Sequence, residues 1–143
     1  MKGQEVTFKT YEVVCREGDL STDLYYVKSG ILLACTIQGT IVKALGKITE
    51  GEFLGELSFF DGKPRASHVV AMTDCEVIKV TKQELENVLP VWFQQAGTNM
   101  TKKIRQLDKI VHDSHLRRFD TQEIKPLSID EQRALLKVIS RKS

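Results

Sequence analysis

Short apolar segments separated by glycine-bearing turns fill the first half of the chain. Strands of a few residues, at turn spacings of roughly ten residues, are typical of an all-β sandwich or barrel and argue against alternating β/α units. The pattern predicts strands over residues 11–15, 24–28, 31–37, 41–45, 66–73 and 75–80. A β-rich body is therefore predicted for the first 80 residues.

After Val80 the spacing of apolar residues changes to that of a helix. The sequence Thr81-Lys82-Gln83-Glu84 is a capping box, in which the threonine and glutamate side chains satisfy free amides at a helix start. Pro90 interrupts this short hinge helix and suits the opening of a new one.

A long amphipathic helix is predicted beyond Pro90. Its apolar stripe recurs at steps of three and four residues and consists of Phe93, Ala96, Met100, Ile104, Leu107 and Val111. A core-facing position is the default interpretation of this stripe. A dimer seam is the alternative, because a short coiled coil has the same spacing.

Residues 120–126 break the long helix, and a second capping box from Ser128 to Glu131 starts a short terminal helix. The predicted order is a β-rich body, a hinge helix, a long helix and a short terminal helix. No internal repeat and no low-complexity segment appears in the sequence.

The composition is that of one ordinary globular domain, with 143 residues of which 41% are hydrophobic and 28% are charged. No stretch approaches the roughly 20 apolar residues of a membrane span, and the charged start lacks the apolar run of a signal peptide. Cys15, Cys35 and Cys75 are odd in number and far apart, so neither a disulfide framework nor a paired-cysteine metal site is indicated. We expect a cytoplasmic protein.

The charge is unevenly distributed along the chain. Residues 1–98 hold 10 Lys and Arg against 13 Asp and Glu, whereas residues 99–143 hold 11 against 6. A basic helical tail could contact nucleic acid, an anionic surface or an acidic partner protein. A solvated helix face is the favoured interpretation.

The segment with the most specific chemistry spans residues 50–78. Gly55 allows a close backbone approach, Glu56 adds a carboxylate, and nine residues later Pro64 and Arg65 supply a rigid turn and a guanidinium. An arginine fork can bind both free oxygens of a cyclic phosphodiester, and backbone amides of a short helical turn add donors. The alternative is a surface turn with a weak Glu56–Arg65 salt bridge.

This segment resembles the phosphate-binding cassette of the cyclic nucleotide-binding domain family, which includes catabolite activator protein and kinase regulatory subunits. The turn Glu17-Gly18-Asp19 and the stretches 24–30 and 73–77 resemble the same family, so the resemblance covers about residues 8–112. It implies a mainly β fold with α: a double-stranded β-roll (jelly roll) at 6–80 and helices at 81–118. Residues 119–143 form a C-terminal extension.

The resemblance also implies a ligand site. Its residues would be Phe53, Gly55, Glu56, Leu57, Ser58, Arg65, Ala66 and Ser67 from the cassette, with Ile104, Leu107 and Asp108 of the long helix near the base. Glu56 would bind the ribose 2′-hydroxyl, and Arg65 with the Ala66 amide would bind the phosphate. The side chain of Ser67 should face away.

The resemblance further implies the ligand and its effect. Members that prefer cGMP often have threonine or serine at the position of Ala66, so alanine there favours cAMP over cGMP. No cofactor and no metal is expected besides this ligand. Binding should reposition the long helix. The apolar stripe, and not the resemblance, predicts a homodimer along that helix, and an unidentified effector protein is a further expected partner.

Other classes of function fit less well. A transcription factor needs a recognition helix beyond the long helix, and residues 119–143 are too few for that domain. His112 and His115 share a helix face, but a metal site there would lack a third ligand. Neither they nor Asp113 is paired with a nucleophile, so no enzyme is expected. Two alternatives stay open: a degenerate module that binds no nucleotide, and a module for another cyclic nucleotide or dinucleotide.

Overall fold

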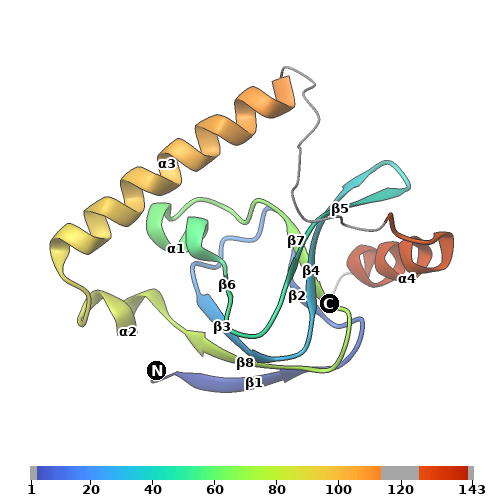
Figure 1. Cartoon of the computed structure of the whole chain (residues 1–143), viewed down its shortest axis with the longest axis horizontal. Helices are drawn as coiled ribbons and strands as arrows, with labels where there is room; N and C mark the ends of the chain where they lie inside the picture. Colours follow the sequence, from blue (N-terminus) through green and yellow to red (C-terminus); the bar gives the residue numbers. More distant parts are fainter. Residues whose placement is uncertain (1–2, 114–125, 142–143) are drawn as a thin grey trace.

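Two four-stranded antiparallel sheets form the body of the protein (Figure 1). The structure is a computed structural model that describes residues 3–113 and 126–141, with the side chains of 3–110 and 126–141. In the first sheet the order is β1 (Gln4–Phe8), β8 (Cys75–Val80), β3 (Leu24–Ser29) and β6 (Phe53–Leu54). In the second it is β2 (Val13–Cys15), β7 (His68–Ala71), β4 (Leu32–Gln38) and β5 (Ile41–Ile48).

The main core lies between the two sheets, because alternate side chains of each strand point inward. Its buried members are Cys15, Tyr25, Val27, Leu32, Leu54, Val69, Ala71, Cys75 and Val77. All three cysteines are buried and unpaired. Burial raises the pKa of Cys15 and of Cys35 to about 11, so both remain neutral thiols.

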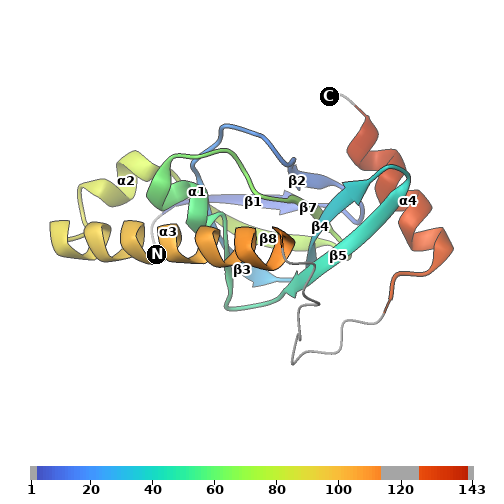
Figure 2. The same ribbon diagram turned by 90° about the horizontal axis from the view of Figure 1, so that it is seen from above.

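The second sheet is apolar on both faces. Leu32 faces the main core, whereas the next residue, Leu33, packs outward with Cys35, Val42 and Val70. The terminal helix α4 (Ile129–Ser140) covers this outer face with its buried Leu135 and Ile139. Figures 1 and 2 show α4 on the side of the β-roll away from the other helices. The C-terminal extension is thus packed on the roll.

Three helices cover the other side: α1 (Glu56–Asp61), α2 (Lys82–Glu86) and α3 (Val91–Asp113). The predicted capping boxes are present, since the Thr81 hydroxyl caps α2 and the Ser128 hydroxyl caps α4. Pro90 separates α2 from α3, as predicted. The long helix lies across α1 in both views (Figures 1 and 2).

The helix α3 docks through a face of small and polar residues. Gly97 lies so close to Phe60 that a Cβ there would be 2.6 Å from Cζ of the ring. The Thr98 hydroxyl donates to the Phe60 carbonyl oxygen at 3.2 Å, Thr101 is buried, and Arg105 forms an ion pair with Asp61.

The core-facing interpretation of the apolar stripe is wrong. Met100 is 63% exposed, Ile104 43% and Leu107 61%. The stripe lies about 100° around the helix from the docked face, which packs closely because its residues are small. The side chain of Val111, together with residues 114–125, lies outside the described residues.

The predicted fold class is confirmed, with local differences: among them, β5 continues to Ile48 and β7 covers only His68–Ala71. Strands β1 and β6 were not predicted. Strand β2 begins at Val13 and not at Tyr11, which adopts a left-handed conformation with φ of 66°.

Candidate functional site

Gly55 sits at the turn between β6 and α1 with φ of +88°. A Cβ at this position would clash with Nη1 of Arg65 and lie 2.7 Å from the carbonyl oxygen of Asp23. Only glycine combines this backbone conformation with so close an approach. The cassette turn therefore lies directly against the arginine, whereas the predicted contact of Gly55 with the ligand stays a prediction.

The guanidinium of Arg65 is buried, with 4% of the residue exposed. Nη1 donates to the Gly55 carbonyl oxygen at 3.1 Å. Nη2 donates to the Ser21 hydroxyl oxygen at 3.1 Å and to the Asp23 carbonyl oxygen at 2.6 Å. The backbone is held as well, because the Arg65 amide donates to the Asp19 carbonyl oxygen at 2.8 Å.

One donor of this arginine has no acceptor. Among the described residues, Nε of Arg65 is the buried side-chain atom without a hydrogen-bond partner. A buried donor left unsatisfied costs about 1–3 kcal/mol, and more when the group is charged. An arginine has five N–H groups, and three hydrogen bonds are formed here. Nε and one N–H of Nη1 are therefore left without an acceptor among the described residues.

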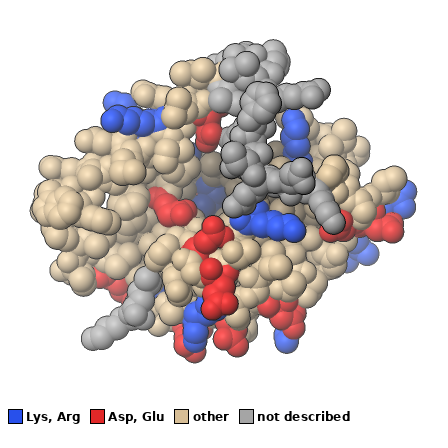
Figure 3. All heavy atoms as spheres, viewed as in Figure 1, with Lys and Arg blue, Asp and Glu red and all other residues tan. Residues whose placement is uncertain are grey.

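The remaining cassette residues surround the arginine. Glu56 is exposed at the first position of α1, and Ser58 is buried two residues later. Desolvation by neighbouring protein atoms raises the pKa of Glu56, although backbone hydrogen bonding and the charge of Arg65 oppose this effect. Ala66 is exposed beside the arginine. Acidic and basic side chains gather around the centre of this face of the molecule (Figure 3).

Phe53, Leu57 and Ser67 are half-buried around the cassette. The Phe53 ring packs against Tyr26, with ring centroids 5.1 Å apart. The carbonyl oxygen of Ser67 faces the Cys15 thiol at 3.9 Å. Ligand contacts for these three residues stay predictions.

Ile104, Leu107 and Asp108 lie on exposed turns of α3. They are brought to the same side of the β-roll as the cassette, because α3 crosses α1 (Figure 1). Their predicted contact with the base of the ligand also stays a prediction.

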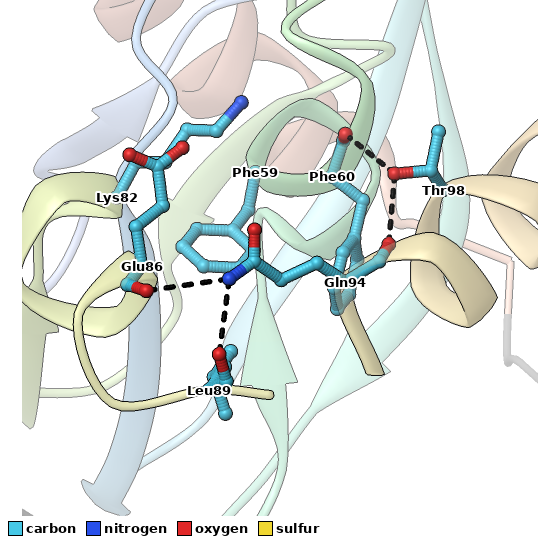
Figure 4. A pocket seen from close by; sticks show the side chains of 7 residues that line it. All are labelled: Phe59, Phe60, Lys82, Glu86, Leu89, Gln94 and Thr98. Atoms are coloured by element: carbon cyan, nitrogen blue, oxygen red, sulfur yellow. Dashed lines mark hydrogen bonds between the residues drawn. The ribbon is translucent and has the colours of Figure 1, made fainter. Parts of the chain in front are cut away.

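A cavity of about 160 Å³ lies away from Arg65, between α1, α2 and α3. Figure 4 shows its lining residues Phe59, Phe60, Lys82, Glu86, Leu89, Gln94 and Thr98. The side-chain amide of Gln94 donates to the carbonyl oxygens of Glu86 and Leu89, which fixes the joint between α2 and α3. The cavity is therefore a feature of this joint and not of the anion site.

Sequence reasoning did not find the acceptors Ser21 and Asp23. They precede Arg65 by 44 and 42 residues, so their meeting depends on the sheet topology. The turn Glu17-Gly18-Asp19 next to them was the available signal. The same turn is held by His68, whose Nδ1 accepts a hydrogen bond from the Glu17 amide at 3.1 Å.

The described residues contain no group of three His, Cys, Asp or Glu side chains that could hold a metal ion. His112 and His115, considered above as ligands, lie outside the described side chains. Within residues 3–113 and 126–141, the structure has no helix with the length and apolarity of a membrane span.

The structure is thus a β-roll domain with an arginine buried against a glycine turn. The family model described as the cyclic nucleotide-binding domain matches residues 5–90, more than half of the chain. The chain therefore belongs to the cyclic nucleotide-binding domain family, as the cassette predicted.

Individual relatives agree with this assignment. The cyclic AMP receptor protein of Thermus thermophilus is 29% identical over 96 residues, which are 64% of this chain and 44% of that protein. The cAMP-dependent protein kinase regulatory subunit of Dictyostelium discoideum is 33% identical over 72 residues, 49% of this chain and 22% of that protein. The chain thus spans less than half the length of either relative.

A solved structure shares the fold. The cAMP-bound form of the EAL enzyme Bd1971 superposes with a TM-score of 0.64 and 26% identity, over 79% of this chain and 32% of that one. The β-roll and its following helices are therefore a shared architecture.

Proposed function

We propose that this chain is a regulatory module that binds cAMP in preference to cGMP and acts by binding, without catalysis or a further cofactor. The observation that carries the proposal is the buried Arg65, whose Nε lacks an acceptor. A cyclic phosphodiester supplies one negative charge and two oxygens, which suits this donor. The preference for cAMP rests on the absence of a hydroxyl at Ala66 and on the cAMP named in both relatives.

Calorimetric titration with cAMP, cGMP and cyclic di-GMP tests the proposal. We expect cAMP to bind more tightly than cGMP and cyclic di-GMP to bind least. Equal or reversed affinities for the two mononucleotides would remove the selectivity, and tight binding of cyclic di-GMP alone would identify another ligand. Absence of binding at millimolar nucleotide would indicate a degenerate module.

The first prediction concerns the role of Glu56. Its carboxylate is exposed at the start of α1, where it can accept a hydrogen bond from a ribose 2′-hydroxyl. Glu56→Ala should weaken cAMP binding by about 1 kcal/mol, the value of a typical hydrogen bond, and should erase the preference for ribose over 2′-deoxyribose analogues. Glu50→Ala, at an exposed position nearby in the sequence, is the control. A sugar preference that survives Glu56→Ala would contradict the assigned role.

We propose that the signal leaves the cassette through α3. The carboxylate of Asp61, the last residue of α1, is held by Nε and Nη2 of Arg105. Burial would raise the pKa of Asp61, but the hydrogen bonds from Arg105 and from the Lys63 amide keep it below its usual range. The cassette helix and α3 are thus linked by a partly buried ion pair, and movement of one affects the other.

The second prediction follows from this link. Hydrogen exchange should slow on adding cAMP in residues 53–67 and in residues 97–110, because the ligand favours one position of α3. Arg105→Gln should confine the slowing to the cassette, whereas Lys102→Gln, an exposed control on the same helix, should leave both effects. Slowing of α3 that persists in Arg105→Gln would contradict this route.

We also propose a homodimer along α3. Met100, Ile104 and Leu107 are exposed and spaced as the seam of a coiled coil. In a parallel pair, the flanking position of Lys103 faces that of Asp108 in the second copy, so the charges are complementary. Any effector protein would then bind a dimer whose α3 helices change position when the ligand binds.

The third prediction tests this seam. Leu107→Lys should shift the sedimentation equilibrium toward monomer by at least tenfold, because it places two lysines opposite each other in an apolar contact. Gln106→Lys is the matched control, since it adds the same charge to a neighbouring exposed position outside the stripe. A parent protein that stays monomeric at high concentration, with and without cAMP, would contradict the dimer.

A further inference from the structure

The side chain of Arg16 binds the C-terminal end of α4. Nε donates to the Ile139 carbonyl oxygen at 3.1 Å, and Nη2 donates to those of Val138 at 3.4 Å and Arg141 at 2.7 Å. The last carbonyls of a helix have no partner within the helix, and a positive charge is favourable there. Arg16 therefore caps a helix that lies more than 120 residues further along the chain.

The same turn holds the cassette arginine on its other side. The Arg16 amide donates to the Asp19 carboxylate at 2.8 Å, which closes the turn. The Gly18 amide donates to the Arg65 carbonyl oxygen at 2.9 Å, and the Arg65 amide donates to the Asp19 carbonyl oxygen at 2.8 Å. One short hydrogen-bonded turn thus contacts both α4 and the residue that meets the ligand.

The helix α4 packs on the outer face of the second sheet. Leu135 and Ile139 are buried against Leu33 and Val70 of the outer sheet face, so the helix has one defined docked position. Residues 129–140 lie outside the part of the chain that matches the family model, which is 5–90. The contact of α4 with the turn at Arg16 therefore lies outside the span of the family model.

We propose that Arg16 is a positioning residue that couples docking of α4 to anion binding at Arg65. Docked α4 fixes the turn and with it the backbone of Arg65, so ligand binding and α4 docking favour each other. Such coupling is reciprocal by thermodynamic necessity. The statement about the ligand rests on the proposed function, whereas the connection between Arg65 and α4 does not.

Hydrogen exchange of the full chain tests the coupling. Saturating cAMP should slow exchange in residues 135–140 about fivefold, at the lower end of typical coupling. Arg16→Gln should abolish that ligand-induced slowing, while Arg133→Gln, which removes an exposed arginine from α4, should retain it. A merely structural role would change the absolute exchange rate and leave the ligand-induced difference in place. Unchanged α4 exchange in the parent, or equal slowing in Arg16→Gln, would overturn the proposal.

A ligand-free experiment separates this inference from the proposed function. If the parent binds no cAMP, the proposed function is wrong. The coupling between Arg65 and α4 is then tested by a double-mutant cycle without ligand. Arg65→Gln should speed exchange in residues 135–140 about fivefold in the parent and not in Arg16→Gln. Ser21→Ala is the milder second variant, because it removes one acceptor of Arg65 and keeps the arginine. An equal effect in both backgrounds would refute the coupling.

Discussion

Replacement of Arg65 by glutamine is expected to weaken cAMP binding about ten- to hundredfold. A hydrogen bond to a charged group contributes about 1.5–3 kcal/mol, and each 1.4 kcal/mol is a factor of ten in Kd. Glutamine can reach one acceptor at best, and it carries no charge for the phosphate. The loss should be visible in a calorimetric titration of the variant beside the parent.

The same replacement should also lower stability. The buried guanidinium donates hydrogen bonds to the carbonyl oxygens of Gly55 and Asp23. These oxygens lose their donor in Arg65→Gln. Lys63→Gln is the control, because Lys63 is exposed two residues away and the charge change is identical. If both variants bind cAMP like the parent, Arg65 does not hold the phosphate.

Gly55→Ala is expected to lower the free energy of unfolding by about 2–5 kcal/mol. A residue with a Cβ pays about 1–2 kcal/mol for a left-handed conformation, and overpacking adds typically 1–3 kcal/mol. The added methyl group would press on Arg65 and Asp23, so ligand affinity should fall as well. Urea unfolding with and without cAMP measures both effects.

Gly51→Ala is a closely matched control. Its φ is +87° against +88° for Gly55, and a Cβ there would meet nothing within 4 Å. It therefore reports the conformational cost alone, about 1–2 kcal/mol, and should leave cAMP affinity unchanged. Equal losses of stability in the two variants would show that the approach of Gly55 to Arg65 is not tight.

Local sequence signals predicted the elements that depend on a few neighbouring residues. The capping boxes at Thr81 and Ser128 gave the starts of α2 and α4 to the residue, because each box closes within three positions. The two-residue strand β6 was beyond such reasoning, since it pairs with β3 through Tyr25 and Tyr26 and has no pattern of its own.

The arrangement of helices on the roll could not be predicted in the same way. The periodicity of α3 indicated one apolar face, but the docked face is instead that of Gly97 and Thr101, whose small side chains carry no hydrophobic signal. The packing of α4 on the second sheet was not predicted either. The apolar run from Ile31 to Cys35 did indicate a strand with apolar residues on both faces, and α4 covers one of these faces.

The docked face of α3 has a consequence for ionic strength. The helix contacts the Phe60 ring through Gly97 and Phe93, and it is also held by the Thr98 hydrogen bond and by the Asp61–Arg105 pair. Ion pairs near the surface weaken as dissolved salt screens them, over a distance of about 8 Å at physiological concentration. Contacts between sheets, and between α4 and its sheet, are apolar and do not weaken in this way. Raising the salt concentration should therefore loosen α3 selectively, while the β-roll and α4 stay folded.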